Sequence, residues 1–225
     1  SRYPEIEMTC GVARDETLIY INDYQLVKKY GLYVDSTFFQ IFDFPLVRGD
    51  CRSVLRGKDD CVVTEDLARQ LFGDSDPIGK HLKLGYYDKV LKVTGVMKEM
   101  ENSSLQKADF VCRFEHVSNE SLVKGMSNAC GSELYLLTKP NTDLRAKTAD
   151  MTQYFKEFFW IFQLKDMESK AIVMPFSEQY FSEISDGSRH TSRGRLKLVR
   201  MLFSSCLVVL LFAVFNYINL TVAQS

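Results

Sequence analysis

The segment from Gly73 to His81 has the residue types of a phosphate-binding loop. It reads Gly-Asp-Ser-Asp-Pro-Ile-Gly-Lys-His, and in a phosphate loop the backbone N–H groups and the lysine of such a segment hold the phosphates. Here five residues instead of four separate the two glycines, and a histidine stands where a Ser or Thr would hold magnesium. The segment also follows a predicted helix, whereas a phosphate loop precedes one. We therefore predict a structural turn and no nucleotide site.

The histidines and cysteines lack the spacing of a metal site. They are His81, His116 and His190, with Cys10, Cys51, Cys61, Cys112, Cys130 and Cys206. No HxxxH, HExxH or CxxC pattern occurs among them. Cys206 lies in an apolar stretch and should behave as a small hydrophobe. For the other five we expect buried thiols; the alternative is one or two disulfides in a domain outside the cytoplasm, with Cys51 and Cys61 the nearest pair in sequence.

No other pattern marks a catalytic centre. The sequence has no serine nucleophile elbow, and its carboxylates have no spacing that singles out an acid–base pair. We therefore predict no catalytic, cofactor-binding or metal-binding residues, no cofactor, and a chain that is not an enzyme.

Charge is divided unevenly along the chain. Of the 225 residues, 46% are hydrophobic, which excludes a disordered chain. The chain carries 28 Lys plus Arg against 29 Asp plus Glu, and this lack of a basic excess argues against a nucleic-acid partner. Residues 189–225 hold five of the basic residues and no acidic one, so residues 1–188 have 23 basic against 29 acidic residues, a net charge of −6. The chain is an acidic globular body with a basic and then apolar tail.

The apolar tail predicts a membrane helix. Residues 201–223 form 23 residues without a charge, and an α-helix needs about 20 apolar residues to cross the hydrocarbon layer. The alternative is a buried C-terminal helix of a soluble domain. Uncharged polar residues within the stretch, such as Ser204, Ser205 and Thr221, are expected to bond to the backbone or to neighbouring helices. Both chain ends look like cuts in a longer membrane protein.

The acidic body predicts a mixture of strands and helices. The predicted strands are 18–21, 32–34, 61–63, 82–84, 90–96, 109–114, 133–138 and 171–174. Asn22-Asp23 should turn between the first two strands. A short helix capped by Asp35 or Ser36 should run through Phe42.

Two longer helices are predicted in the same body. Thr64 is a natural N-cap for a helix that buries Leu67, Leu71 and Phe72 and ends at Gly73. A second helix should begin near residues 141–142 and carry an aromatic stripe as far as Phe162. We expect this stripe to belong to the core; the alternative is that it lines a substrate or partner groove. Residues 178–200 should lead into the membrane helix.

Three sequence blocks carry a resemblance to a known family. They are FFQIFDFPLVRGD at 38–50, VVTEDLARQLFGDSDPIGK at 62–80 and VTGV at 93–96. Together they closely resemble the MacB-like periplasmic core domain, the extracytoplasmic insert between the first and second membrane helices of FtsX-like ABC transporter permeases. The segment FNYINL at 215–220 resembles the second membrane helix of such permeases. The sequence is similar to permeases of the Bacteroides group.

The resemblance implies an α+β fold with two subdomains. Residues 1–34 plus 106–188 would form a porter-like subdomain, residues 35–105 a mobile middle subdomain, 189–200 a basic linker, and 201–223 the second transmembrane helix. Pro77-Ile78-Gly79-Lys80 is interpreted as a structural turn, so the resemblance supplies no ligand site.

The resemblance also implies a function and partners. Similar permeases transmit ATP-driven conformational change across the bacterial inner membrane, with this domain in the periplasm, for export or envelope signalling. The implied partners are a cytoplasmic ABC ATPase subunit, a second permease copy forming a dimer, a periplasmic adaptor and membrane lipid. The alternatives are a membrane-anchored extracytoplasmic sensor or binding domain, and a membrane-tethered enzyme whose site the sequence does not reveal.

The basic residues before the apolar stretch conflict with this topology. The five residues are Arg189, Arg193, Arg195, Lys197 and Arg200, and the positive-inside rule would place them in the cytoplasm. The family topology places them outside. We follow the family topology, because the rule compares both flanks of a membrane helix and the sequence contains only the flank before this one.

Overall fold

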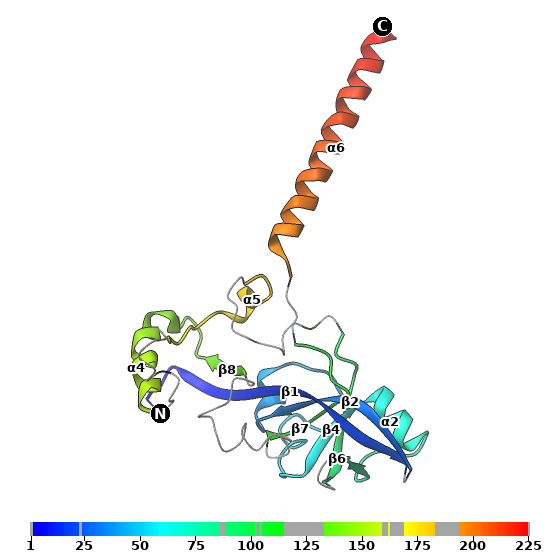
Figure 1. Ribbon diagram of the computed structural model, residues 1–225, viewed down its shortest axis with the longest axis vertical. Coiled ribbons are helices and arrows are strands. Elements are labelled where there is room, and N and C mark those ends of the chain that lie inside the picture. Colours follow the sequence, from blue (N-terminus) through cyan, green and yellow to red (C-terminus); the bar gives the residue numbers. More distant parts are fainter. Residues whose placement is uncertain are drawn as a thin grey trace. The chain divides into compact units, whose positions relative to one another are not determined.

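The computed structural model (Figure 1) consists of two compact units. It describes residues 2–22, 24–85, 89–101, 103, 105–114, 133–158, 162, 169–182 and 194–224. The first unit holds every described strand and the helices up to Met174, and the second holds the two C-terminal helices.

One mixed sheet forms the first unit. Its strands are β1 Ile6–Asn22, β2 Gln25–Val34, β3 Leu46–Arg48, β4 Asp60–Thr64, β5 His81–Lys83, β6 Val90–Met97, β7 Phe110–Arg113 and β8 Glu133–Thr138. Their order is β3-β6-β4-β7-β2-β1-β8, with β5 paired to β6. The β2–β7 and β4–β6 pairs are parallel and the other pairs antiparallel. The sheet therefore combines strands of both predicted subdomains, residues 1–34 plus 106–188 and residues 35–105. The boundaries between the subdomains stay a prediction.

The first two strands form a longer hairpin than the sequence indicated. Asn22 pairs with Gln25 at its tip, where the Asn22 side-chain oxygen accepts the N–H of Tyr24 at 3.0 Å. The turn at Asn22 is thus confirmed.

The sheet curves until β5 meets β1. Leu84, just after β5, forms an antiparallel bridge with Ile19 of β1, and the Gly85 N–H donates to Leu18 O at 2.7 Å. The ladder thus runs β1-β2-β7-β4-β6-β5 and returns to β1. Its interior is filled by apolar side chains, including Leu82 and Leu91 at 0% exposure, so the curved sheet encloses a packed core.

A second cluster covers the opposite face of the strands. It centres on Phe38 of α1 (Phe38–Ile41), whose ring stacks on that of Phe44 with centroids 5.6 Å apart. The predicted cap of this helix was wrong, because Thr37 occupies the N-cap position. The Asp35 carboxylate instead accepts the Gly11 N–H of β1 at 2.8 Å.

The helix α2 (Glu65–Phe72) begins and ends at the predicted residues. The Thr64 hydroxyl accepts the Leu67 N–H at 3.3 Å, and Gly73 follows with φ 59°. Leu67 is buried against the sheet, whereas Leu71 and Phe72 are only half-buried. The predicted burial is therefore confirmed for Leu67 and was too high for the other two.

The region after β8 differs from the prediction. A 3₁₀ turn η2 (Leu144–Lys147) precedes α4 (Thr148–Phe158), because the Asp143 carboxylate accepts the Arg145 N–H at 2.9 Å and starts the tighter turn first. Residues 171–174 are not a strand. The Ala171 N–H donates to the Thr152 hydroxyl of α4 at 2.9 Å, so this segment lies on the helix instead of joining the sheet.

Residues of the aromatic stripe contribute to a third, smaller cluster. Phe155 packs with buried Leu144, Met151 and Ala171, and its ring lies 5.7 Å from that of Phe162. Residues 159–161 of the stripe lie outside the described residues.

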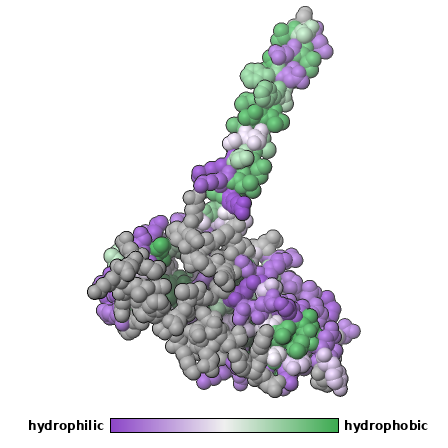
Figure 2. All heavy atoms as spheres, viewed as in Figure 1, coloured by the Kyte–Doolittle hydropathy of each residue, from purple (hydrophilic) through white to green (hydrophobic). Residues whose placement is uncertain are grey.

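The second unit holds α5 (Phe176–Gln179) and α6 (Leu196–Ala223). With 28 residues, α6 is long and apolar enough to cross a membrane, and hydrophobic residues follow most of its length (Figure 2). It begins five residues before the predicted stretch and so includes Lys197 and Arg200. The hydroxyls of Ser204, Ser205 and Thr221 each donate to the carbonyl four residues earlier at 2.9 Å, which confirms the expected backbone bonding.

Candidate functional site

The Gly73–Lys80 segment folds as two successive turns after α2. The Asp76 carboxylate accepts the Ile78 N–H at 3.0 Å, and the Lys80 N–H donates to Pro77 O at 3.1 Å. Gly79 has φ 82°, a left-handed conformation that glycine adopts readily. The Pro77-Ile78-Gly79-Lys80 sequence is therefore a tight turn that needs its glycine.

The backbone donors of this turn already have partners within the protein. The Gly79 N–H donates to Val93 O of β6 at 2.7 Å, and the Val93 N–H donates back to Lys80 O at 2.8 Å. The Lys80 ammonium lies over the Phe72 ring, 5.0 Å from its centroid. These contacts join the turn to β6, and they leave the amides of residues 78–80 directed at protein acceptors instead of a phosphate.

The start of α2 is occupied in the same way. The Glu99 carboxylate accepts the Asp66 N–H at 3.1 Å, beside the Thr64 cap. Because the protein supplies its own anion and hydroxyl there, the positive end of this helix is already satisfied.

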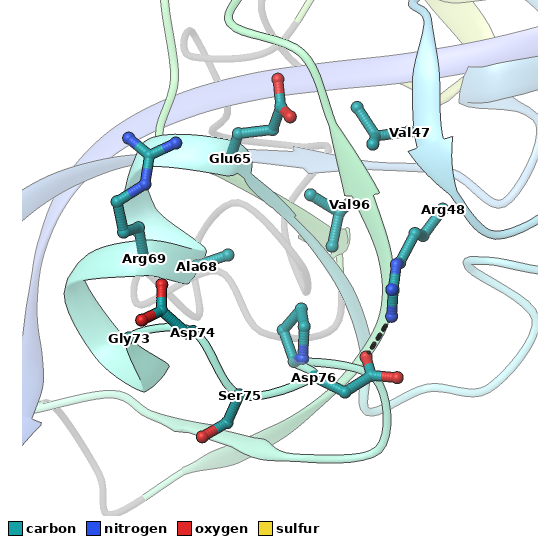
Figure 3. A pocket seen from close by; sticks show the side chains of 11 residues that line it. Val47, Arg48, Glu65, Ala68, Arg69, Gly73, Asp74, Ser75, Asp76 and Val96 are labelled. Carbon is teal, nitrogen blue, oxygen red and sulfur yellow. Dashed lines mark ion pairs between the residues drawn. The ribbon is translucent and has the colours of Figure 1, made fainter.

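A solvent-open pocket of about 390 Å³ lies between β3, α2 and the turn (Figure 3). Its lining residues are Val47, Arg48, Glu65, Ala68, Arg69, Gly73, Asp74, Ser75, Asp76, Pro77 and Val96. In Figure 3 the Arg48 and Asp76 side chains point toward one another on one side of the pocket, while Glu65 and Arg69 extend from α2 on the other. The pocket thus combines apolar surface with side chains of both signs.

Ion pairing sets the electrostatics of this pocket. Arg48 and Asp76 are 2.6 Å apart at their nearest atoms, and Arg69 lies 3.3 Å from Asp66. The Ile78 N–H and the Arg48 guanidinium lower the pKa of Asp76 below its usual value. Asp76 is therefore a structural anion that holds the turn to β3. No sequence pattern indicates this pair, since its members are 28 positions apart.

Of the three histidines, one lies in the described part of the chain. His81 is exposed in β5, and His116 and His190 lie outside the described residues. No group of three or more His, Cys, Asp or Glu side chains that could hold a metal occurs among the described residues.

Two of the cysteines lie together, and sequence distance did not indicate them. Cys61 of β4 and Cys112 of β7 are direct partners in the antiparallel ladder. Cys51, the nearest cysteine to Cys61 in sequence, is exposed, whereas Cys61 is buried. The expectation of a buried thiol was therefore wrong for Cys51. Cys10 is buried, Cys206 is exposed on α6, and Cys130 lies outside the described residues.

The fold and this site define an α+β domain followed by a helix of membrane-spanning length. The sequence profile of the MacB-like periplasmic core domain matches residues 3–154. The chain therefore belongs to this family, whose members are periplasmic domains of ABC transporter permeases. No curated protein matches the chain.

Three solved structures are similar in fold. One, described as a domain of a permease protein from Porphyromonas gingivalis, has a TM-score of 0.60 and 20% identity, with 88% of this chain and 80% of that chain covered. The periplasmic region of MacB from Actinobacillus actinomycetemcomitans has a TM-score of 0.51 and 15% identity over 74% and 72%. The extracellular domain of the ABC-type transporter YknZ from Gram-positive bacteria has a TM-score of 0.52 and 14% identity over 76% and 83%.

Proposed function

We propose that this chain is the extracytoplasmic domain and second membrane helix of an ABC transporter permease subunit, and that it transmits ATP-driven movement across the bacterial inner membrane. The observation that carries the proposal is the occurrence of a MacB-like domain and a 28-residue apolar helix in one chain. The proposed partners are a cytoplasmic ABC ATPase, a second permease copy and a periplasmic adaptor.

The two units have the properties that such transmission requires. Movement passes between distant sites through stiff elements whose arrangement both sites can bias. The continuous helix α6 is one stiff element, and the closed ladder of β1, β2, β7, β4, β6 and β5 is another. Transmission of movement needs no bound substrate in this domain. The proposed subdomains remain residues 1–34 plus 106–188 and residues 35–105.

A flexible insertion before α6 tests the proposal. Insertion of a long Gly-Ser stretch between Gly187 and Arg193, in the full permease with its ATPase, should interrupt the mechanical link. We expect the ATPase to copurify and hydrolyse ATP, while the ATP-dependent change in distance between spin labels at Cys51 of the two permease copies is lost. Cys51 is exposed and so accepts a label. Cys206, which is exposed on α6, and Cys130 are replaced by Ser in all samples.

The matched control carries the same insertion at the β1–β2 hairpin tip. Tyr24 at this tip is 98% exposed, so an insertion beside it should leave the distance change intact. A full distance change with the insertion before α6 would contradict transmission and would favour the sensor or binding module.

A further inference from the structure

Cys61 and Cys112 face each other across two neighbouring strands. They are Cα partners in the antiparallel β4–β7 pair, near the start of β4 and next to the pair Val62 and Val111. Both side chains belong to the same buried cluster and both are 0% exposed. The two sulfur atoms therefore lie on the same face of the sheet, within the enclosed core.

The hydrogen-bond pattern of the ladder gives this pair a favourable geometry. The Thr64 N–H donates to Asp109 O at 3.0 Å, which makes Thr64 and Asp109 a hydrogen-bonded pair. Because hydrogen-bonded and non-hydrogen-bonded pairs alternate, the register makes Cys61 and Cys112 a non-hydrogen-bonded pair. In such pairs the Cα atoms are about 4.5 Å apart and the side chains are closest, and disulfides accept Cα separations of about 4.4 to 6.8 Å.

The other described cysteines have no such arrangement. Cys10 lies in the cluster on the opposite face, and its partner in the β1–β8 ladder is Tyr135. Cys51 is exposed in the turn after β3. These two residues therefore serve as natural controls, one buried and one exposed.

We propose that Cys61 and Cys112 form a disulfide in the mature protein. The Sγ–Sγ bond replaces two S–H bonds, and two protons and two electrons leave. The electrons pass to the disulfide of an extracytoplasmic dithiol–disulfide oxidase, which becomes a dithiol. The proposal rests on the proposed location outside the cytoplasm, where such oxidants maintain disulfides.

Burial determines when the bond forms and how it behaves. Burial raises the pKa of Cys61, so its thiol would react slowly once the core has closed. The bond should therefore form while β4 and β7 are still accessible during folding, and should resist reductants in the native protein. It would covalently fix the β4–β7 pairing, which joins the proposed middle segment to the proposed porter-like segment.

Peptide mapping without reduction tests the proposal. Cells that export the full permease are quenched with acid, and the protein is alkylated under denaturing conditions with N-ethylmaleimide and digested with trypsin. Cleavage after Lys58, Arg69, Lys107 and Arg113 places the two cysteines in separate peptides, residues 59–69 and 108–113. We expect these peptides to be recovered linked, and to separate after reduction. The Cys10 peptide, residues 3–14, should be alkylated without reduction.

A single substitution provides the matched control. In Cys61→Ser, peptide 108–113 should become alkylated without reduction. If this variant does not fold, recovery of peptides 59–69 and 108–113 as a linked pair from the unaltered protein still tests the disulfide. Labelling of Cys51 from outside the cell reports the location separately. Outward-facing Cys51 with peptides 59–69 and 108–113 both fully alkylated would overturn the disulfide and leave the proposed function standing. An inward-facing Cys51 would contradict the location on which both proposals rest.

Discussion

At the residue scale, burial distinguishes positions that look alike in the sequence. Leu67 and Leu71 occupy the same apolar stripe of α2, yet Leu67 is 1% exposed and Leu71 is half-buried. Leu67 faces the interior of the curved sheet, whereas Leu71 lies at its margin and packs against the cluster from outside. The cost of removing each side chain should follow this difference.

Leu67→Ala should therefore destabilise the domain more than Leu71→Ala. For the fully buried leucine the loss of contacts and the cavity should lower the free energy of unfolding by about 2 to 5 kcal/mol, and for the half-buried one by about 1 kcal/mol. Urea unfolding of the detergent-solubilised chain, followed by circular dichroism, measures both. Exposed Arg69→Ala is the control, with a change within about 0.5 kcal/mol. Equal costs for the two leucines would show that α2 packs differently.

At the element scale, α6 is the helix among the described ones that is long and apolar enough to cross a membrane. None of its residues is buried, and large apolar side chains such as Phe203, Phe212 and Phe215 are 61 to 70% exposed. At about 1.5 Å per residue its 28 residues extend about 42 Å, more than the roughly 30 Å of a hydrocarbon layer. Its exposed apolar surface is therefore suited to lipid and to other membrane helices.

Removal of α6 should convert the chain into a soluble domain. We expect residues 1–188 to be monodisperse without detergent and to unfold cooperatively, because the sheet and its two main clusters lie within this range. Residues 1–225 should require detergent or aggregate. Size-exclusion chromatography of both proteins, with and without detergent, measures the difference. A detergent-free, monodisperse 225-residue chain would show that α6 is covered by its own domain.

At the scale of the whole molecule, two features make opposite predictions about the orientation in the membrane. Arg195, Lys197 and Arg200 lie at the start of α6, and basic flanks are usually cytoplasmic. Membership of the MacB-like family predicts the opposite, with the sheet domain outside. The flank and the domain must lie on the same side, so one experiment on the domain decides between them.

Cys51 provides that experiment. We expect a membrane-impermeant maleimide to label Cys51 of the full permease in intact cells, since this cysteine is exposed on the domain. Labelling is quantified as the difference between the unaltered protein and Cys51→Ser, which removes the contribution of other cysteines. If Cys51 reacts only after the inner membrane is permeabilised, the basic flank and not the family determines the topology.

The sequence alone determined the features that depend on local pattern. Thr64, Leu67 and Gly73 predicted α2 with its cap and its end, because capping and helical periodicity involve residues close along the chain. The uncharged stretch at 201–223 predicted α6 by length and composition. The three blocks at 38–50, 62–80 and 93–96 indicated the family that the match over residues 3–154 establishes.

The tertiary structure decided the features that depend on strand register and on competition for hydrogen bonds. Register between distant segments places Cys61 opposite Cys112 and Ile19 beside Leu84. Asp35, a plausible helix cap, binds the Gly11 N–H instead. Residues 171–174 have the composition of a strand, yet the Thr152 hydroxyl accepts the Ala171 N–H and holds this segment on α4. In each case the partner is a group far away in the sequence, and only folding brings it within reach.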